Sequence, residues 1–166
     1  MLFCVTGGVE LKTLFVYCSG DDTVNSLCSE SVLRKRDTKA LELNHNIHKS
    51  AFSRYFGIHR VRRFSSVGSY GVDVDEFDKI IFACDEYMGE IPPEVCAFIT
   101  KNNLRYKTID CIVFGDGRNV QKAKNMLRNR ISLSGGTVRN IISISVKELK
   151  REEEDVLFSV RHRMAV

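Results

Sequence analysis

The sequence predicts an α/β protein, a three-layer α/β/α sandwich built on a five-stranded parallel sheet. Apolar runs rich in β-forming residues alternate along the chain with segments whose apolar residues recur at helical spacing. Such alternation produces parallel β-α-β units whose right-handed crossovers place helices on both faces of the sheet. The 166 residues suit one domain. We expect an N-terminal extension, residues 1–10, and a single domain, residues 11–166.

Three elements are expected in the first part of that domain. Residues 11–18, LKTLFVYC, form a nearly continuous apolar run, typical of a strand buried on both faces. Residues 19–23, SGDDT, are turn and capping types, and the apolar spacing from Val24 predicts a helix from about Thr23 to Lys35. Residues 40–43 alternate as a short second strand, preceded by a surface turn at residues 34–38.

The middle of the chain contains a long connection and a clear third strand. Residues 45–74 exceed an ordinary connection, and a helix is expected within them at residues 50–56. Residues 80–84, IIFAC, are the third strand. Both prolines of the chain follow it, and the apolar residues 95–99 fit a helix that starts just after Pro93.

The last part of the chain repeats the alternation. Residues 109–114, IDCIVF, are the fourth strand, and residues 120–130 form a basic amphipathic helix. A fifth strand is expected at residues 138–146. A final helix over residues 146–160 carries mixed acids and bases on its outer face.

The composition restricts the function classes. Hydrophobic residues make up 43% and charged residues 28%, and no segment approaches the ~20 apolar residues of a membrane span. The first twelve residues make a poor secretory signal, and the six cysteines occur singly without a C-x-x-C pair, so we expect a cytoplasmic protein with reduced thiols. A net charge of +4 is too weak to indicate nucleic-acid binding.

Candidate binding residues follow three of the expected strands. In open α/β sheets, ligands bind outside the carboxyl ends of the strands, where the strand order reverses. Residues 19–23 supply small polar side chains and backbone amides at a helix N-terminus, which suits a phosphate. Residues 84–90 supply an aromatic beside a glycine, which suits a planar ligand, and residues 115–119 supply two glycines that permit close approach.

These loops resemble the motifs of the flavodoxin family, in its short-chain form, over roughly residues 11–160. That family has a strand ending in a serine- and threonine-rich loop, a strand followed by aromatic residues, a glycine and a proline-rich helix start, and a loop with two glycines. The matching segments are residues 13–23 (TLFVYCSGDDT), 80–95 (IIFACDEYMGEIPPEV) and 113–119 (VFGDGRN). Residues 50–56 also look like the stretch after the second strand in some short members.

The resemblance implies non-covalently bound FMN, with electron transfer or flavin-dependent redox chemistry as the activity. The phosphate-binding residues that it implies are Ser19, Gly20, Asp21, Asp22 and Thr23. The implied ring-binding residues are Cys84, Asp85, Glu86, Tyr87, Met88 and Gly89 from one loop, and Phe114, Gly115, Asp116, Gly117 and Asn119 from another. It also implies a redox partner protein or an NAD(P)H-linked reductase. We expect a monomer or dimer, with no nucleic acid and no membrane partner.

Several alternatives stay open from the residues themselves. Asp21 and Asp22 oppose a phosphate dianion by roughly 1 kcal/mol each in solvated positions. Asp22 is alternatively a helix N-cap, and Tyr87 alternatively packs in the core. Asp85 and Glu86 are alternatively solvent-exposed at a strand end. The second function hypothesis is therefore a flavin-free binding or regulatory module on the same fold.

Other chemistry-bearing residues have simpler interpretations. His45 and His48 share a helical spacing but lack a third metal ligand nearby. Cys18 and Cys84 end two strands without a local histidine base, so buried thiols are expected. Two basic clusters fit solvated faces, and the first could alternatively meet an acidic partner or a nucleotide. The clusters are Arg54, Arg60, Arg62 and Arg63, and Lys122, Lys124, Arg128 and Arg130.

Overall fold

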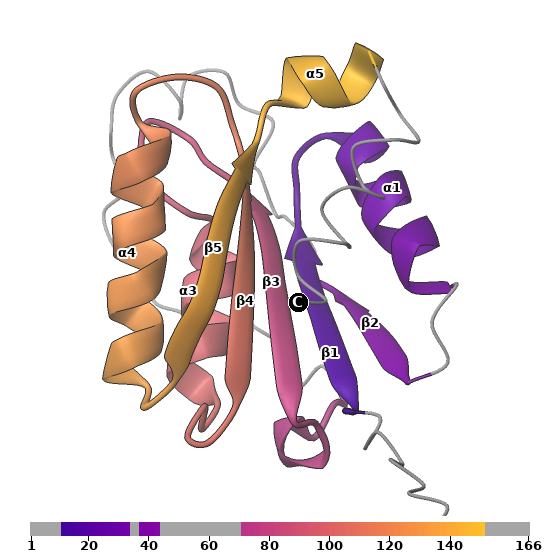
Figure 1. Ribbon diagram of the computed structural model, residues 1–166, viewed down its shortest axis with the longest axis vertical. Coiled ribbons are helices and arrows are strands. Elements are labelled where there is room, and N and C mark those ends of the chain that lie inside the picture. Colours follow the sequence, from indigo (N-terminus) through magenta and orange to yellow (C-terminus); the bar gives the residue numbers. More distant parts are fainter. Residues whose placement is uncertain (1–10, 34–36, 44–70, 152–166) are drawn as a thin grey trace, which may run out of the picture.

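The computed structural model describes residues 11–33, 37–43 and 71–151, and it confirms the predicted fold class (Figure 1). Five parallel strands form one sheet in the order β2-β1-β3-β4-β5. The strands are β1 (Thr13–Cys18), β2 (Thr38–Glu42), β3 (Lys79–Asp85), β4 (Thr108–Phe114) and β5 (Thr137–Ile144). The helices are α1 (Asp22–Leu33), the 3-10 helix η1 (Val74–Glu76), α3 (Pro93–Lys101), α4 (Val120–Leu133) and α5 (Val146–Arg151).

The predicted elements differ from the observed ones at their ends, and η1 was not predicted. β2 begins at Thr38, which the sequence had placed in a turn, and β5 ends at Ile144 instead of Val146. α4 continues beyond Arg130 to Leu133, because Ile131 still faces the core there. The helix expected at residues 50–56 and the final helix beyond Arg151 lie outside the described residues.

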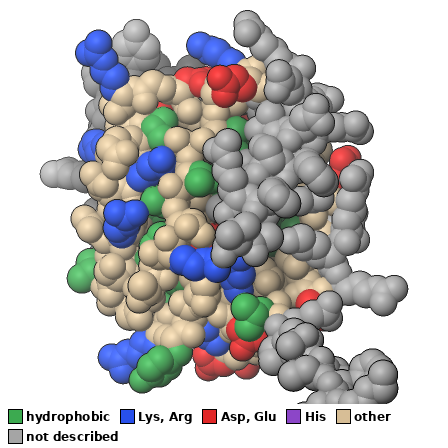
Figure 2. Space-filling model, in the orientation of Figure 1, with side chains coloured by type: hydrophobic (Ala, Val, Ile, Leu, Met, Phe, Trp, Pro, Cys, Tyr) green, Lys and Arg blue, Asp and Glu red, His purple; other side chains and the backbone are tan. Residues whose placement is uncertain are grey.

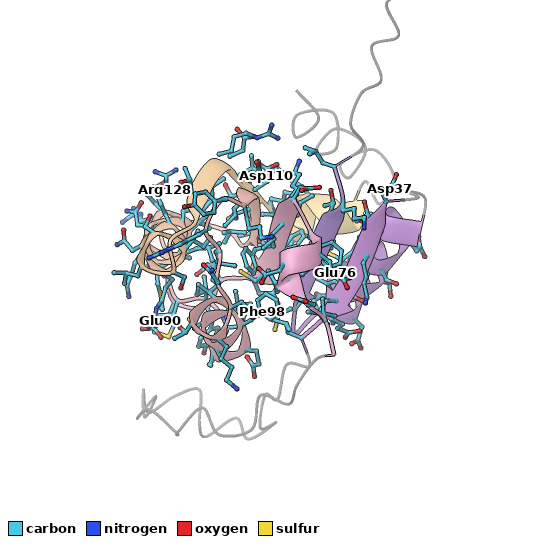
Figure 3. All side chains as sticks on the ribbon, turned by 90° about the horizontal axis from the view of Figure 1, so that it is seen from below. Asp37, Glu76, Glu90, Phe98, Asp110 and Arg128 are labelled. Carbon is cyan, nitrogen blue, oxygen red and sulfur yellow. The ribbon has the colours of Figure 1, made fainter. Side chains whose placement is uncertain are left out.

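Helices cover the sheet on two faces, as the alternation predicts. α3 and α4 pack on one face around Phe82, Phe98 and Leu127, and α1 packs on the other against Phe15 and Tyr17. Viewed from below in Figure 3, Phe98 and Asp110 lie on opposite sides of the sheet. Within the ranges described, no helix has the length and apolar character needed to cross a membrane.

β1 and β3 are neighbours with a constant offset of 66 residues. Thr13 pairs with Lys79, and Cys18 pairs with Cys84 at the carboxyl ends of the two strands. Continuing this register places residue 19 beside residue 85. Because side chains alternate along a strand, Ser19 and Asp85 project toward the same face, the one that α1 covers.

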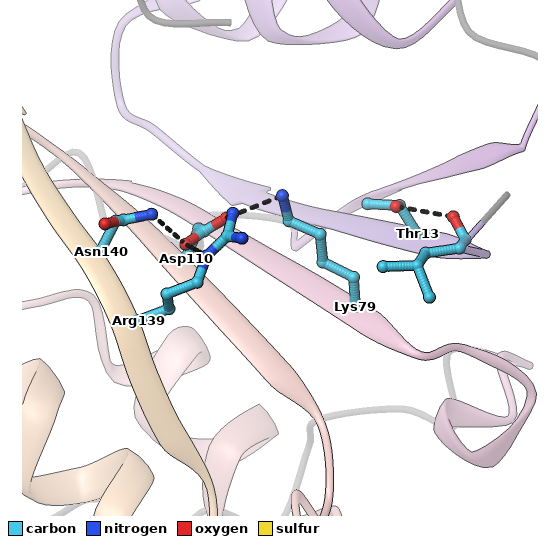
Figure 4. A network of polar contacts seen from close by, with 6 residues as sticks. Thr13, Lys79, Asp110, Arg139 and Asn140 are labelled. Carbon is cyan, nitrogen blue, oxygen red and sulfur yellow. Dashed lines mark hydrogen bonds and ion pairs between the residues drawn. The ribbon is translucent and has the colours of Figure 1, made fainter. Parts of the chain in front are cut away.

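β5 contains an irregularity opposite β4. Ile109 pairs with Val138 but Asp110 pairs with Asn140, so Arg139 is an extra, bulged residue. The bulge lets two consecutive side chains reach the carboxylate of Asp110, which is fully buried (Figure 4).

The Asp110 carboxylate is the centre of a polar network. It accepts hydrogen bonds from Arg139 Nη2 at 3.0 Å and Asn140 Nδ2 at 3.0 Å, and it lies 2.7 Å from Lys79 Nζ. Burial by itself raises the pKa of this carboxyl, but the bonds from Arg139 and Lys79 outweigh burial and lower the pKa below its ordinary value. Asp110 is therefore a buried, charge-compensated group at the amino half of β4.

Candidate functional site

The three predicted loops lie together at the carboxyl edge of the sheet. They follow β1, β3 and β4, and the strand order reverses between β1 and β3, where ligands bind in such sheets. Glu86 N donates to Phe114 O at 2.8 Å, and Gly115 N donates to Ile144 O at 3.0 Å. These bonds extend the sheet into the loops after β3 and β4.

The carboxylate of Asp85 is hydrogen-bonded to the loop of residues 19–23. Ser19 Oγ lies 2.8 and 2.7 Å from its two oxygens, and Gly20 N donates to Oδ2 at 2.8 Å. Ser19 Oγ in turn accepts a bond from Asp21 N at 3.0 Å. The hydroxyl and the amide that were expected to hold a phosphate thus hold a carboxylate of the chain itself.

Asp21, and not Asp22, caps α1. Asp21 Oδ1 accepts a hydrogen bond from Thr23 N at 3.0 Å, and the helix begins one residue earlier than expected, at Asp22. The N-cap interpretation of Asp22 was therefore wrong by one position. Asp22 is an exposed residue of the first turn, and its charge is favourable near the positive end of the helix.

Residues 87–90 form a tight two-residue hairpin. Tyr87 and Glu90 exchange backbone hydrogen bonds of 2.9 and 3.0 Å, and Met88 and Gly89 both have positive φ, 52° and 82°. Positive φ at both central positions defines a type I′ turn. Tyr87 is 49% and Met88 65% exposed, so the alternative that Tyr87 packs in the core was wrong. The hairpin presents an aromatic ring and a thioether to solvent.

Glu86 joins the hairpin to the loop after β4. Its Oε2 accepts a bond from Gly89 N at 2.9 Å, and a Cβ placed on Gly115 would lie 2.3 Å from its Cγ. Glu86 and Asp85 are both half-buried and hydrogen-bonded, so simple solvent exposure was the wrong alternative for either. Gly115 is required here because the Glu86 side chain lies directly over it.

The rest of the loop after β4 is open to solvent. Asp116, Gly117 and Asn119 are exposed, and nothing lies within 4 Å of a Cβ placed on Gly117. Gly117 has a φ of 100°, so a side chain there would strain the backbone. This loop and the hairpin lie at the same edge of the sheet, and the Glu86 side chain contacts both, Gly89 in the hairpin and Gly115 in the loop.

The cysteines near this edge are structural. Burial raises the pKa of the Cys18 and Cys84 thiols, with smaller contributions from neighbouring charged and thiol groups that include Asp85. The raised pKa disfavours the thiolate form of both groups, and their burial agrees with the buried thiols expected from the sequence.

The remaining candidates are the two basic clusters and the two histidines. Residues 54–63, His45 and His48 fall outside the described residues, and the described ones contain no group of three or more potential metal ligands. In Figure 2, Lys and Arg side chains are spread over the α4 and β5 side of the visible face, separated by uncharged atoms. That distribution fits the solvated face expected for the α4 cluster.

Sequence reasoning missed the place of Asp85. All residues of the loop after β3 were expected to face a planar ligand. The Asp85 side chain instead points to the loop of residues 19–23. A usable signal existed: the apolar runs of β1 and β3 both end on a cysteine, so aligning them end to end sets Ser19 beside Asp85. Cofactor binding by the sixteen candidate residues stays a prediction.

Solved structures match this arrangement over most of the chain. A flavoprotein from Lactobacillus acidophilus in complex with FMN is 12% identical with a TM-score of 0.59, covering 86% of this chain and 97% of that chain. The chain has the flavodoxin-like fold. A Fusobacterium nucleatum flavodoxin bound to flavin mononucleotide is 11% identical with a TM-score of 0.55, over 92% of this chain and 99% of that chain.

A third structure with this flavodoxin-like fold is the apo form of an NADH:FMN oxidoreductase. It is 18% identical with a TM-score of 0.53, covering 88% of this chain and 82% of that chain. No protein-family model matches the sequence. No curated protein matches it either. At these identities, the likeness shows the fold.

Proposed function

We propose that this chain is a flavodoxin-like flavin-binding protein that serves electron transfer or flavin-dependent redox chemistry. The observation that carries the proposal is the exposed Tyr87 and Met88 pair on a fixed hairpin beside the open loop of residues 115–119. This pair lies at the edge where flavodoxin-like sheets bind ligands. Structural neighbours bound to FMN add support.

The ring end of a flavin suits the residues at this edge. The aromatic face of Tyr87 and the polarizable sulfur of Met88 offer a stacking surface for a planar heterocycle. The space in front of Gly117 allows a ligand to approach the backbone closely. A bound flavin would supply reversible electron transfer, and the carboxylates of Glu86 and Asp116 would disfavour extra negative charge on it.

The phosphate end of FMN does not fit the loop of residues 19–23 as the structure has it. The Ser19 hydroxyl and the Gly20 N–H are hydrogen-bonded to the Asp85 carboxylate, and the N–H of Thr23 donates to Asp21 Oδ1. FMN binding through this loop would require the Asp85 carboxylate to leave. We therefore replace the FMN expected from the sequence with the broader proposal of a flavin that binds through its ring system.

Fluorescence tests the proposal directly. Titrating the protein into riboflavin and, separately, into FMN should quench the fluorescence of at least one of them. Tyr87→Ala should weaken that binding about tenfold, in line with the stacking contribution of one aromatic residue. Tyr106→Ala is the matched control, because Tyr106 is another exposed tyrosine but lies just before β4, at the amino edge of the sheet. Absence of quenching with both flavins would exclude the proposed function.

The electron donor or acceptor is proposed to be a redox protein or an NAD(P)H-linked reductase in the cytoplasm. An NADH:FMN oxidoreductase among the structural neighbours supports this choice. Incubation of the flavin-loaded protein with NADH under anaerobic conditions, with and without a cell extract, would show whether reduction is direct or needs a partner. Bleaching of the flavin absorbance is the readout.

A flavin-free binding or regulatory module is the second candidate. The observation that favours it is the same Asp85 carboxylate, because the chain supplies its own anion to the loop that would hold the cofactor phosphate. A colourless purified protein that quenches neither flavin would support this candidate over the first.

A further inference from the structure

We infer that the site selects a flavin without a phosphate, riboflavin, over FMN, and that Asp85 determines this specificity. The inference rests on the proposed function, because it names which flavin the ring site accepts. Asp85 is a specificity residue in this sense: its carboxylate stands where the phosphate of FMN would have to bind.

The hydrogen-bond donors of the loop carry the first argument. A phosphate group is held in such loops by hydroxyl and backbone N–H donors at a helix N-terminus. Here Ser19 Oγ and Gly20 N lie 2.7 to 2.8 Å from Asp85 oxygens, which are distances of well-formed hydrogen bonds. A phosphate would have to displace a charged acceptor that already has good geometry.

Charge carries the second argument. The FMN phosphate has close to two negative charges at neutral pH, and Asp85 and Asp21 are both bonded within the loop that would receive it. Like charges within a few ångströms repel one another, whereas riboflavin is neutral and has no such cost. Its hydroxyl-bearing side chain can instead donate hydrogen bonds to a carboxylate.

The sheet carries the third argument, because it fixes where Asp85 stands. Its backbone pairs with Phe114 of β4, and the preceding residue, Cys84, pairs with Cys18 of β1. The next residue, Glu86, is bonded through its N–H to Phe114 O. β3 lies between β1 and β4, so the register of the sheet fixes the position from which Asp85 reaches Ser19. The carboxylate is therefore a built part of the site.

Dissociation constants for riboflavin and FMN, measured by fluorescence quenching on the full chain, test the inference. The wild-type protein should bind riboflavin at least about tenfold more tightly than FMN. Asp85→Asn, which keeps the shape and removes the charge, should reduce or reverse that ratio by strengthening FMN binding. Glu90→Gln is the matched control, since it removes one exposed carboxylate at the same edge, and it should leave the ratio unchanged.

The outcomes separate the inference from the proposed function. FMN binding as tight as riboflavin, or a ratio that Asp85→Asn does not move, would overturn the inference while leaving a flavin site in place. No binding of either flavin would overturn both. If Asp85→Asn fails to fold, the wild-type protein still decides. Raising the salt concentration should strengthen FMN binding and leave riboflavin binding unaltered, and a salt-independent FMN affinity would contradict the inference.

Discussion

Two aspartates on the same face of the sheet differ in how the protein treats their charge. Asp110, at the amino half of β4, is fully buried and bonded to two cationic side chains and an amide. Asp85, at the carboxyl end of the adjacent β3, is half-buried and bonded to a hydroxyl and a backbone N–H of a loop. The charge of Asp110 is buried and compensated by cations, whereas the carboxylate of Asp85 is partly exposed at the edge that carries the candidate site. The first region contributes to stability, and specificity is what we propose for the second.

Asp110→Asn should give the largest effect, because it leaves Lys79, whose side chain is only 14% exposed, without its carboxylate partner. Breaking a buried ion pair on one side costs about 3–5 kcal/mol of unfolding free energy. Urea denaturation measures it. Asp75→Asn is the control: Asp75 is 79% exposed and 4.0 Å from Lys107, and its loss should cost at most about 1 kcal/mol. Equal losses in both variants would remove the distinction between the two kinds of carboxylate.

Gly115→Ala should destabilise the carboxyl edge by about 1–3 kcal/mol, because the new methyl group would collide with the Glu86 side chain. Glu86→Ala opens space for it but loses the bond to Gly89 N. The double variant should therefore be more stable than the sum of the single effects predicts, and a double-mutant cycle in urea measures this coupling. Strict additivity would show that the two residues do not share this contact.

Acid should weaken the wild type more than Asp110→Asn. The folded-state pKa of Asp110 is lowered, so its contribution to stability is fully present above the ordinary pKa of 3.8 and is lost as the pH falls through the folded value. The difference in unfolding free energy between wild type and Asp110→Asn should be constant from pH 7 to about pH 5 and shrink below about pH 4. A difference that stays constant down to pH 2 would contradict this assignment.

Met88→Gly should have the smallest effect on stability and the opposite sign. Met88 has a φ of 52°, which costs a residue with a side chain roughly 1 kcal/mol and a glycine almost nothing. Thermal unfolding should therefore show a slight stabilisation, whereas flavin affinity should fall because the exposed thioether is lost. Unchanged affinity would remove Met88 from the ring site and leave Tyr87 alone there.

The fold and the place of the site could be predicted from the sequence, because each depends on local patterns. The apolar runs of β1, β3 and β4 and the turn residues after them set the strands, the parallel sheet and the edge that carries the loops. The side-chain contacts could not be predicted in the same way. Asp85 reaches Ser19 through a register between strands 66 residues apart, and one residue at the start of α1 decides whether Asp21 or Asp22 is the cap.

The bulge in β5 has a consequence for how this chain tolerates changes of length. Since Asn140 lies opposite Asp110 and Val138 opposite Ile109, excising Arg139 would regularise the ladder and leave Ile142 and Ile144 facing the same way. A deletion elsewhere in the strand would turn every later residue over. Removing the residue at this position would therefore keep the later side chains of β5 on their present faces, but it would also remove one of the two cations bonded to the buried Asp110.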